Sequence, residues 1–306
     1  MYSFLYKVYF IKFKNQNIDR LYQRLTIRVL NILLPVIFKI FPGNNNSIKK
    51  EQGNKKPEYI VSLTTFPARI NKVWLAIESI LRQKEKPDKI ILWLYEGEFN
   101  GKESLPKILL KLERRGLEIR FCDENLKPHN KYFYTMQEFP EANVITVDDD
   151  MFYPPDLIEK LKNFHQIYPN CIISTIIRKI IVNGGIIMPY GEWTILRTNT
   201  LPSYSLLTMG VGGALFPSES INKEVFNLSE LKERALTADD LWLKVMSLKN
   251  ETKVVGIAGE FVKNYVPIIF KNNKRLMDIN IGEGENDRIF ETLMNYYKIP
   301  LTIFDQ

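Results

Sequence analysis

The stretch from Asn143 to Leu161, NVITVDDDMFYPPDLIEKL, decides the fold. Its apolar run Val144–Val147 is typical of a buried strand, and a helical pattern resumes after Pro155. Between them stand the three carboxylates of Asp148–Asp150. Adjacent carboxylates repel one another, and a single Asp is enough to cap a turn. The stretch therefore predicts a ligand site at the end of a strand.

Strand-like and helix-like segments alternate on the N-terminal side of this stretch. The predicted strands are 58–65, 89–95, 117–122 and 143–147, and the helices between them are 71–83, 105–114 and 131–139. This alternation predicts an α/β fold with an open, mostly parallel sheet flanked by helices. In such a sheet ligands bind beyond the carboxyl ends of the strands, where Asp148–Asp150 stand. The sequence contains neither GxGxxG nor GxxxxGK[ST], so no dinucleotide fingerprint or P-loop is present.

Length and composition indicate a folded globular protein. The chain has 306 residues, of which 45% are hydrophobic, enough for one large core or two modest ones. Cys122 and Cys171 are the two cysteines, and neither belongs to a CxxC pair. This spacing argues against a structural zinc site and fits a reducing cytosol.

The net charge of +7 is concentrated at the N-terminus. Residues 1–41 hold seven basic residues and one acidic residue, which leaves 35 basic and 34 acidic residues in the remainder. The body is therefore nearly neutral, and it shows no signature of nucleic-acid binding.

Residues 1–41 are predicted to form a basic, amphipathic, membrane-associating helical segment. Four polar residues recur at helical spacing: Arg20, Arg24, Arg28 and Asn31. Seven apolar residues fall on the other side: Ile18, Leu21, Tyr22, Leu25, Val29, Ile32 and Leu33. The longest stretch without charge is shorter than the roughly 20 residues that a spanning helix needs, which favours an interfacial position on an anionic membrane. Packing of this helix on the protein itself or on a partner is the alternative.

Residues 42–58 are rich in Pro, Gly, Asn and Lys and predict a linker, which leaves 59–306 as the main domain. The first fourteen residues lack a long apolar core and a small-residue cleavage site, so a secretory signal is not expected. The predicted location is therefore cytoplasmic, peripheral on the inner face of the cell membrane.

The three carboxylates suit a hard divalent cation. Mg²⁺ and Mn²⁺ take one or two carboxylates and complete their coordination with phosphate and water. An EF-hand loop is excluded because Tyr153 occupies the position that needs glycine. Capping of the following helix, the structural alternative, accounts for one Asp but not for three.

Four segments together resemble bacterial glycosyltransferases with the GT-A fold, the nucleotide-sugar-dependent, DXD-containing, family 2-like group. These segments are IVSLTTFPARI at 60–70, NKYFY at 130–134, VDDDMFYP at 147–154 and TADDLWLK at 237–244. The resemblance extends from Tyr59 to Tyr297. It implies a GT-A domain and a nucleoside-diphosphate-sugar donor, with a UDP-sugar favoured, whose diphosphate is bridged to the protein by Mn²⁺ or Mg²⁺.

The resemblance also implies roles for individual residues. Asp148 would contact the ribose or the metal, Asp150 would coordinate the metal, and Asp149 would belong to the nucleotide-sugar site. Further donor contacts are implied for Thr64, Thr65, Arg69 and Lys131. The structural alternatives are a Thr-rich turn, an exposed Arg and a solvated Lys.

A second acidic pair, Asp239 and Asp240, opens a predicted helix, where one Asp would be enough for a cap. The resemblance implies that this pair takes the proton from the acceptor hydroxyl. Ala238 stands where many relatives have Glu or Gly, so either carboxylate could be that base. The spacing to Leu243 favours Asp240.

Two further segments are candidates for sugar contacts. In related enzymes a Gly-rich passage lines the donor sugar, and here Gly212 and Gly213 allow close backbone approach, although a tight strand connection would also need them. Tyr190 and Trp193 could stack on an acceptor sugar or be buried in the core. The lone His129 is expected to serve packing.

The resulting functional hypothesis is a metal-dependent glycosyltransferase of hexosyltransferase type in cell-surface polysaccharide biosynthesis. It would add sugar to a glycan or lipid-linked acceptor. The alternatives are an inactive GT-A-like glycan-binding or scaffold protein and a metal-dependent nucleotidyltransferase.

Overall fold

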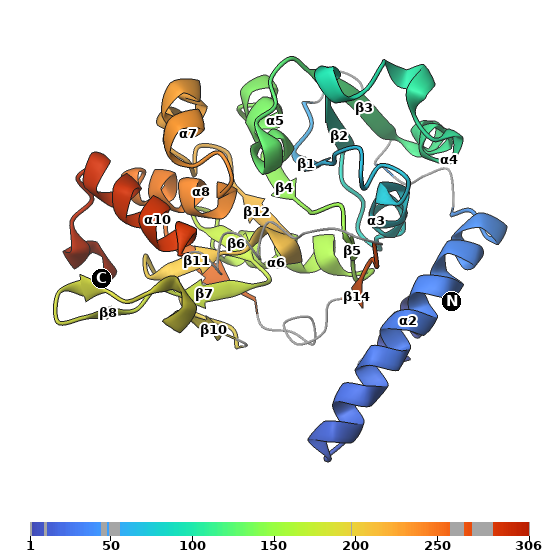
Figure 1. The fold of residues 1–306 in the computed structure, drawn as a ribbon, viewed down its shortest axis with the longest axis horizontal. Coiled ribbons are helices and arrows are strands. Elements are labelled where there is room, and N and C mark those ends of the chain that lie inside the picture. The colour runs from blue at the N-terminus through green and yellow to red at the C-terminus, as the bar shows by residue number, and fades with distance from the viewer. Residues whose placement is uncertain are drawn as a thin grey trace.

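A central sheet flanked by helices dominates the computed structural model (Figure 1), which describes residues 2–8, 11–43, 48, 56–196, 198–257, 266–270 and 284–305. The helices are α1 Tyr2–Val8, α2 Gln16–Ile40, α3 Val73–Leu81, α4 Lys107–Leu110, α5 Phe133–Glu138, α6 Leu157–Ile167, α7 Leu228–Arg234, α8 Asp239–Lys249 and α10 Glu285–Tyr296. The strands of the central sheet are β1 Tyr59–Thr64, β2 Lys89–Tyr95, β3 Leu117–Cys122, β4 Asn143–Thr146, β6 Ile172–Ser174, β12 Ala214–Phe216 and β13 Val254–Gly256. Most of the predicted linker, 42–58, lies outside the described residues.

The central sheet has the strand order β13-β6-β12-β4-β1-β2-β3. Strands β1 to β4 are the four predicted strands, and every pairing among them is parallel. Strand β12 is antiparallel to both of its neighbours, β4 and β6. The prediction of an open, mostly parallel α/β sheet with helices on its faces and an N-terminal helical segment is confirmed.

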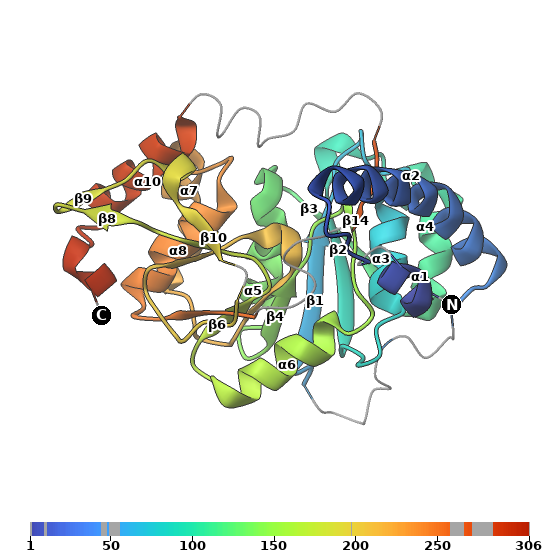
Figure 2. The same cartoon turned by 90° about the horizontal axis from the view of Figure 1, so that it is seen from below.

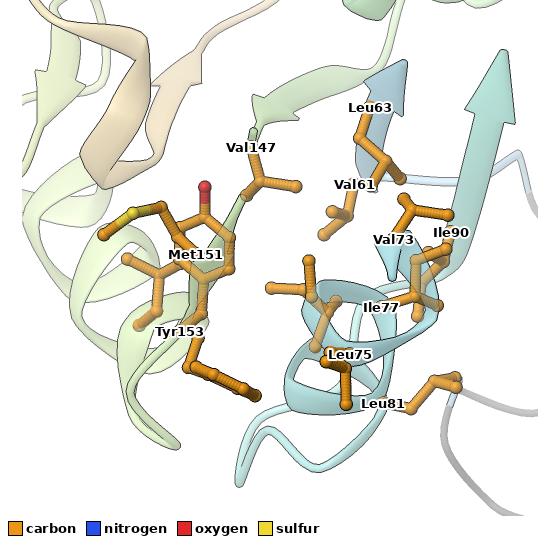
Figure 3. Close-up of a cluster of buried hydrophobic side chains, with 14 of the residues drawn as sticks. Val61, Leu63, Val73, Leu75, Ile77, Leu81, Ile90, Val147, Met151 and Tyr153 are labelled. Carbon is orange, nitrogen blue, oxygen red and sulfur yellow. The ribbon is translucent and has the colours of Figure 1, made fainter. Parts of the chain in front are cut away.

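The side chains of β1 point alternately to the two faces of the sheet and contact a different helix on each face. Val61 and Leu63 point toward Val73 and Ile77 of α3 (Figure 3), and all four are fully buried. On the other face, the Ser62 hydroxyl lies 2.7 Å from that of Thr135 on α5. Because successive strand residues point to opposite faces, one short strand supplies both helical layers.

The predicted helices are present with shifted ends. The segment predicted as a helix over 105–114 is α4 followed by the 3₁₀ helix Lys111–Arg115. The segment predicted over 131–139 begins later, because a 3₁₀ helix at Lys127–Lys131 precedes α5.

The second half of the chain forms a separate apolar cluster around α8 and α10. Trp242 and Leu293 are both fully buried in it. The smaller sheets hold β5 Met151–Phe152, β7 Ile177–Lys179, β8 Val182–Asn183, β9 Ile186–Ile187, β10 Thr194–Leu196, β11 Leu206–Thr208 and β14 Val266–Pro267. Strand β14 pairs antiparallel with β5, directly after the acidic stretch.

Helix α2 confirms the predicted N-terminal helix and lies along α3 and β14 in both views (Figures 1 and 2). Asn15 caps it by accepting hydrogen bonds from two of its first amides. Leu30, Leu34 and Phe38 are buried against the body. Among the described residues, α2 alone is long and apolar enough to cross a membrane, by length and composition only.

Candidate functional site

The acidic stretch lies at the carboxyl end of the parallel strands, as predicted. Ser62 of β1 pairs with Thr146 of β4, and the Val147 amide donates to the Ser62 carbonyl at 3.1 Å. The residues that follow the two strands, Thr65 and Asp148–Asp150, therefore leave the sheet side by side. This is the edge where ligands bind in open α/β sheets.

Asp149 points inward and joins the exits of the two strands. One of its carboxylate oxygens accepts a hydrogen bond from the Thr65 hydroxyl at 2.5 Å, and the other accepts from the Arg69 guanidinium at 2.5 Å. Asp149 is only 5% exposed. Breaking a buried pair of this kind is strongly destabilising, so Asp149 fixes the positions of Thr65 and Arg69.

Asp148 and Asp150 retain access to solvent, with side chains that are 27% and 30% exposed. The Asp148 amide donates to the Tyr153 hydroxyl at 2.6 Å, which anchors the turn. Asp150 Oδ2 lies 3.0 Å from Arg69, whereas Asp150 Oδ1 is buried without a hydrogen-bond partner in the described structure. Burial, and then repulsion from Asp148, raises the pKa of Asp150 to about 6.

Lys131 joins the two acidic segments, which lie about 90 residues apart in the sequence. Its ammonium is 2.8 Å from Asp148 Oδ1 and 2.7 Å from Asp239 Oδ2. Burial works to lower the pKa of Lys131, but Asp148, Asp239 and Asp240 raise it well above its usual value. The structure thus brings both predicted acidic groups and the predicted Lys131 into one site.

The two carboxylates of the second pair have different surroundings. Burial opposes ionisation of Asp239, yet Lys131 and then His129 hold its pKa below the usual range. Asp240 Oδ1 accepts a hydrogen bond from the Gly210 amide at 3.0 Å. Burial, followed by the charge of Asp239, raises the pKa of Asp240 well above its usual value. Of the two, Asp240 is the stronger proton acceptor.

The Gly-rich passage packs tightly against this cluster. A Cβ on Gly210 would lie 2.6 Å from the Lys131 ammonium nitrogen, closer than real contacts allow. Gly213 has φ +89°, and the Thr175 hydroxyl donates to the Gly212 carbonyl at 2.7 Å. A side chain at 210 would therefore displace the Lys131 ammonium from its carboxylates, and glycine at 213 is favoured by its left-handed backbone conformation.

The acidic stretch offers carboxylate oxygens to a divalent cation. The described residues contain no group of three His, Cys, Asp or Glu side chains arranged to hold a metal. However, the partner-free oxygen of Asp150 and the partly exposed carboxylate of Asp148, which also pairs with Lys131, make a pair of oxygen donors on one turn. Two carboxylates are enough for Mg²⁺ or Mn²⁺ when phosphate and water complete the coordination. The donor set therefore fits such an ion.

Some sequence candidates lie away from open solvent. Tyr190 and Trp193 are 5% and 3% exposed and pack with Phe290 in the α8–α10 cluster, so they present no ring face for stacking on an acceptor. Thr64 donates its hydroxyl to the Trp93 carbonyl at 2.9 Å. His129 is buried between Tyr132 and the Ala235 carbonyl, which agrees with its expected packing role.

Lys244 is a buried cation beside Asp240 that the sequence did not reveal. It is 3% exposed, and its ammonium has no hydrogen-bond partner within the described part of the chain. The buried Thr208 hydroxyl also lacks one there, and both residues line a small pocket with Asp240. Burial lowers the pKa of Lys244 to about 7.

Lys244→Met is expected to stabilise the protein by up to about 5 kcal/mol near pH 6, because each unit of pKa shift corresponds to about 1.4 kcal/mol. The folded pKa of Lys244 lies below the unfolded value, so the folded state binds fewer protons between them. Stability of the natural protein should therefore rise with pH above about 7, and the advantage of the variant should shrink toward pH 10. Urea unfolding of both proteins at pH 6, 8 and 9.5 measures this difference.

A matched control is Lys249→Met, on the same helix, where loss of the contact between the ammonium and the Tyr297 ring should cost about 1 kcal/mol or less. An advantage of Lys244→Met that does not depend on pH would show that repacking, rather than removal of the buried amine, explains it.

No protein-family model and no curated protein sequence matches this chain. Similar solved structures include S. aureus TarS 1-349, with 10% identity, 81% of this chain and 66% of that chain covered, and a TM-score of 0.47. Another is mannosyltransferase PcManGT from Pyrobaculum calidifontis in complex with GDP-Man and Mn2+, with 15% identity, coverage of 77% and 65%, and a TM-score of 0.41. A third is apo-UDP-glucose pyrophosphorylase, with 10% identity, coverage of 80% and 99%, and a TM-score of 0.38.

The chain spans about two thirds of the length of the first two of these structures. At TM-scores below 0.5 the similarities assign no function.

Proposed function

We propose that this chain is a metal-dependent glycosyltransferase with a GT-A domain, which moves a sugar from a nucleoside diphosphate to a hydroxyl of a glycan or lipid-linked acceptor. The observation that supports it best is the bridge made by Lys131. This single buried ammonium pairs with Asp148 at the end of β4 and with Asp239 at the start of α8. The bridge thereby brings a proposed donor-binding group and the acidic pair that contains the proposed base into one site at the ligand-binding edge of the sheet.

On the donor side, Asp148 and Asp150 would hold Mn²⁺ or Mg²⁺. The bound cation would neutralise charge on the departing nucleoside diphosphate, of which a UDP-sugar is the favoured donor. Arg69 is fixed between Asp149 and Asp150, and it stacks between the rings of Phe66 and Phe270 at 5.3 and 5.2 Å. A guanidinium held in this way is already immobilised before the donor binds. It would therefore orient the donor phosphate without a further entropic cost for ordering its own side chain.

On the acceptor side, Asp240 would remove the proton of the attacking hydroxyl. The bond from that oxygen to the anomeric carbon forms as the bond from the anomeric carbon to the diphosphate oxygen breaks, so the sugar is transferred with inversion. The raised pKa of Asp240 makes it a better base than an exposed carboxylate. The Gly210 amide holds one of its oxygens, which leaves the other for the acceptor.

The test is release of nucleoside diphosphate from a panel of UDP- and GDP-sugars with Mn²⁺ or Mg²⁺. We expect turnover with one donor, loss of it with EDTA, and a fall of about 10²-fold or more in Asp150→Asn. Glu141→Gln, an exposed carboxylate paired with Lys56, is the matched control and should retain full activity.

Other outcomes contradict the proposal. Formation of pyrophosphate from a nucleoside triphosphate and a sugar phosphate would identify a nucleotidyltransferase instead. If none of the donors in the panel is bound or turned over, the protein would instead be a catalytically inactive glycan-binding or scaffold protein with the same fold.

A further inference from the structure

Helix α2 presents a long apolar stripe that the rest of the described chain does not cover. Its members are Ile18, Leu21, Leu25, Val29, Ile32, Leu33, Val36 and Ile40, each between 41% and 68% exposed. The helix contacts the body through a different side, formed by Leu30, Leu34 and Phe38. The helix therefore carries more apolar residues than its packing against the body buries. A patch of this kind marks an interaction surface.

Basic residues border this stripe on one side. Arg20, Arg24 and Arg28 follow one another at intervals of four along the helix, and all are exposed. No acidic side chain in the described ranges forms an ion pair with any of the three. Their charge is therefore available to an anionic partner that covers the adjoining apolar stripe.

The basic border distinguishes a bilayer from a second copy of the same helix. Spacing alone does not, because apolar residues from Ile18 to Val36 also recur at the intervals of four and three that a coiled coil needs. A second copy of α2 would offer the three arginines one carboxylate, Asp19, which already bonds to the Phe13 amide and to Gln23. An anionic bilayer offers phosphates along the whole stripe, so the charge pattern matches a bilayer surface better.

Contacts between α2 and the body favour a position in the interface over a spanning orientation for the folded protein. The Asn31 amide nitrogen donates to the Pro267 carbonyl at 2.9 Å, and the Ile269 amide donates to Asn31 Oδ1 at 2.8 Å. A helix fixed along the body by these bonds cannot enter the hydrocarbon core without taking polar surface with it. Arg24 and Arg28, in the N-terminal half of the helix, would add to the cost of a spanning orientation.

We propose that α2 docks this protein in the plane of an anionic lipid bilayer, with its apolar stripe in the interface and its arginines on lipid phosphates. The docked helix would lie close to the acidic site. It bonds to the segment after β14, and the Ile268 amide in that segment donates to the Asp150 carbonyl at 2.7 Å. If the proposed transfer reaction holds, this position favours an acceptor carried by a lipid.

Sedimentation of the full-length protein with vesicles tests the docking independently of any catalytic activity. We expect binding to vesicles of phosphatidylcholine with 30% phosphatidylglycerol, weaker binding to phosphatidylcholine alone, and release by alkaline carbonate. The triple variant Leu25→Gln, Val29→Gln, Ile32→Gln should lose binding while keeping its circular dichroism spectrum, because all three side chains are exposed.

A charge variant separates the electrostatic part. Replacing Arg20, Arg24 and Arg28 by Gln should weaken binding to the anionic vesicles about 100-fold, at about 1 kcal/mol per basic residue. The control variant Lys179→Gln, Lys223→Gln, Lys298→Gln carries the same loss of charge at exposed positions outside α2, in β7, at the 3₁₀ helix Lys223–Phe226 and after α10, and should bind normally.

Three results would overturn the proposal. One is sedimentation of the Leu25, Val29, Ile32 variant at the natural level. Another is retention of the natural protein in carbonate-washed vesicles, which would show that α2 spans. The third combines two observations on the natural protein: it does not bind vesicles, and light scattering shows a dimer that the Leu25, Val29, Ile32 variant does not form. That result would show that a second copy covers the stripe.

Discussion

Asp240→Asn is expected to lower the turnover number of sugar transfer about 10²- to 10⁴-fold, the usual contribution of a positioned general base. Asn has the shape of Asp and keeps an oxygen for the Gly210 amide, which now donates to Asp240 Oδ1 at 3.0 Å. Donor affinity should therefore change little. Turnover measured at saturating donor and acceptor, together with calorimetric titration of the nucleoside diphosphate, separates the two effects.

Asp239→Asn is the informative comparison for this prediction. Its carboxylate pairs with Lys131, so its loss should weaken folding as well as activity. Should Asp239→Asn abolish turnover in a fully folded protein while Asp240→Asn remains active, the base would be Asp239 and the assignment of the pair would be reversed.

Lys131→Met is expected to lower the free energy of unfolding by about 3 to 5 kcal/mol and to abolish activity. The substitution leaves the carboxylates of Asp148 and Asp239 facing each other without the cation that now lies within 2.8 Å of both. Removing one member of a buried pair leaves an uncompensated charge, which is the costly case. Urea unfolding of the natural and variant proteins gives the difference.

The control and the pH dependence sharpen this test. Lys102→Met breaks a more exposed pair with Glu113 and should cost less than about 1 kcal/mol. Because Lys131 holds the folded pKa of Asp239 below its unfolded value, the stabilisation is present above that unfolded value and is lost as pH falls through the folded one. A cost that stayed constant as pH fell from about 5 to about 2 would mean that lost packing, not charge, explains the variant.

Much of the sheet could be predicted because β1 to β4 carry local signals. Each is a short apolar run followed by a helical pattern, and the parallel order follows from their alternation. Strand β12 has no such signal. It enters between β4 and β6 in the opposite direction, and its three residues Ala214–Phe216 owe their place to partners distant in the sequence.

The acidic stretch shows where local sequence stops being informative. Three consecutive Asp residues look equivalent, yet the turn after β4 sends Asp149 inward to Thr65 and Arg69 and leaves Asp148 and Asp150 accessible. The direction of each side chain depends on the Tyr153 hydroxyl that holds the Asp148 amide. That contact is set by tertiary packing.

Helices α2 and α8 make the same point with periodic patterns. The periodicity of α2 predicts one apolar stripe. In the structure a second apolar side of the helix, with Leu34 at its centre, packs against the body. On α8, Lys244 occupies a buried position within an apolar helix, where a cation has no sequence signal. The sequence pattern places Asn31 on a polar stripe, and in the structure its side chain bonds to the Pro267 carbonyl of β14.

A crystal structure with Mn²⁺ and a nucleoside diphosphate tests the central claim most directly. We predict an anomalous scattering peak in contact with the carboxylates of Asp148 and Asp150, with the diphosphate on its open side and Asp240 facing the same cavity. A site that stays empty at saturating Mn²⁺ with both UDP and GDP, or a metal bound away from these two carboxylates, would contradict the account.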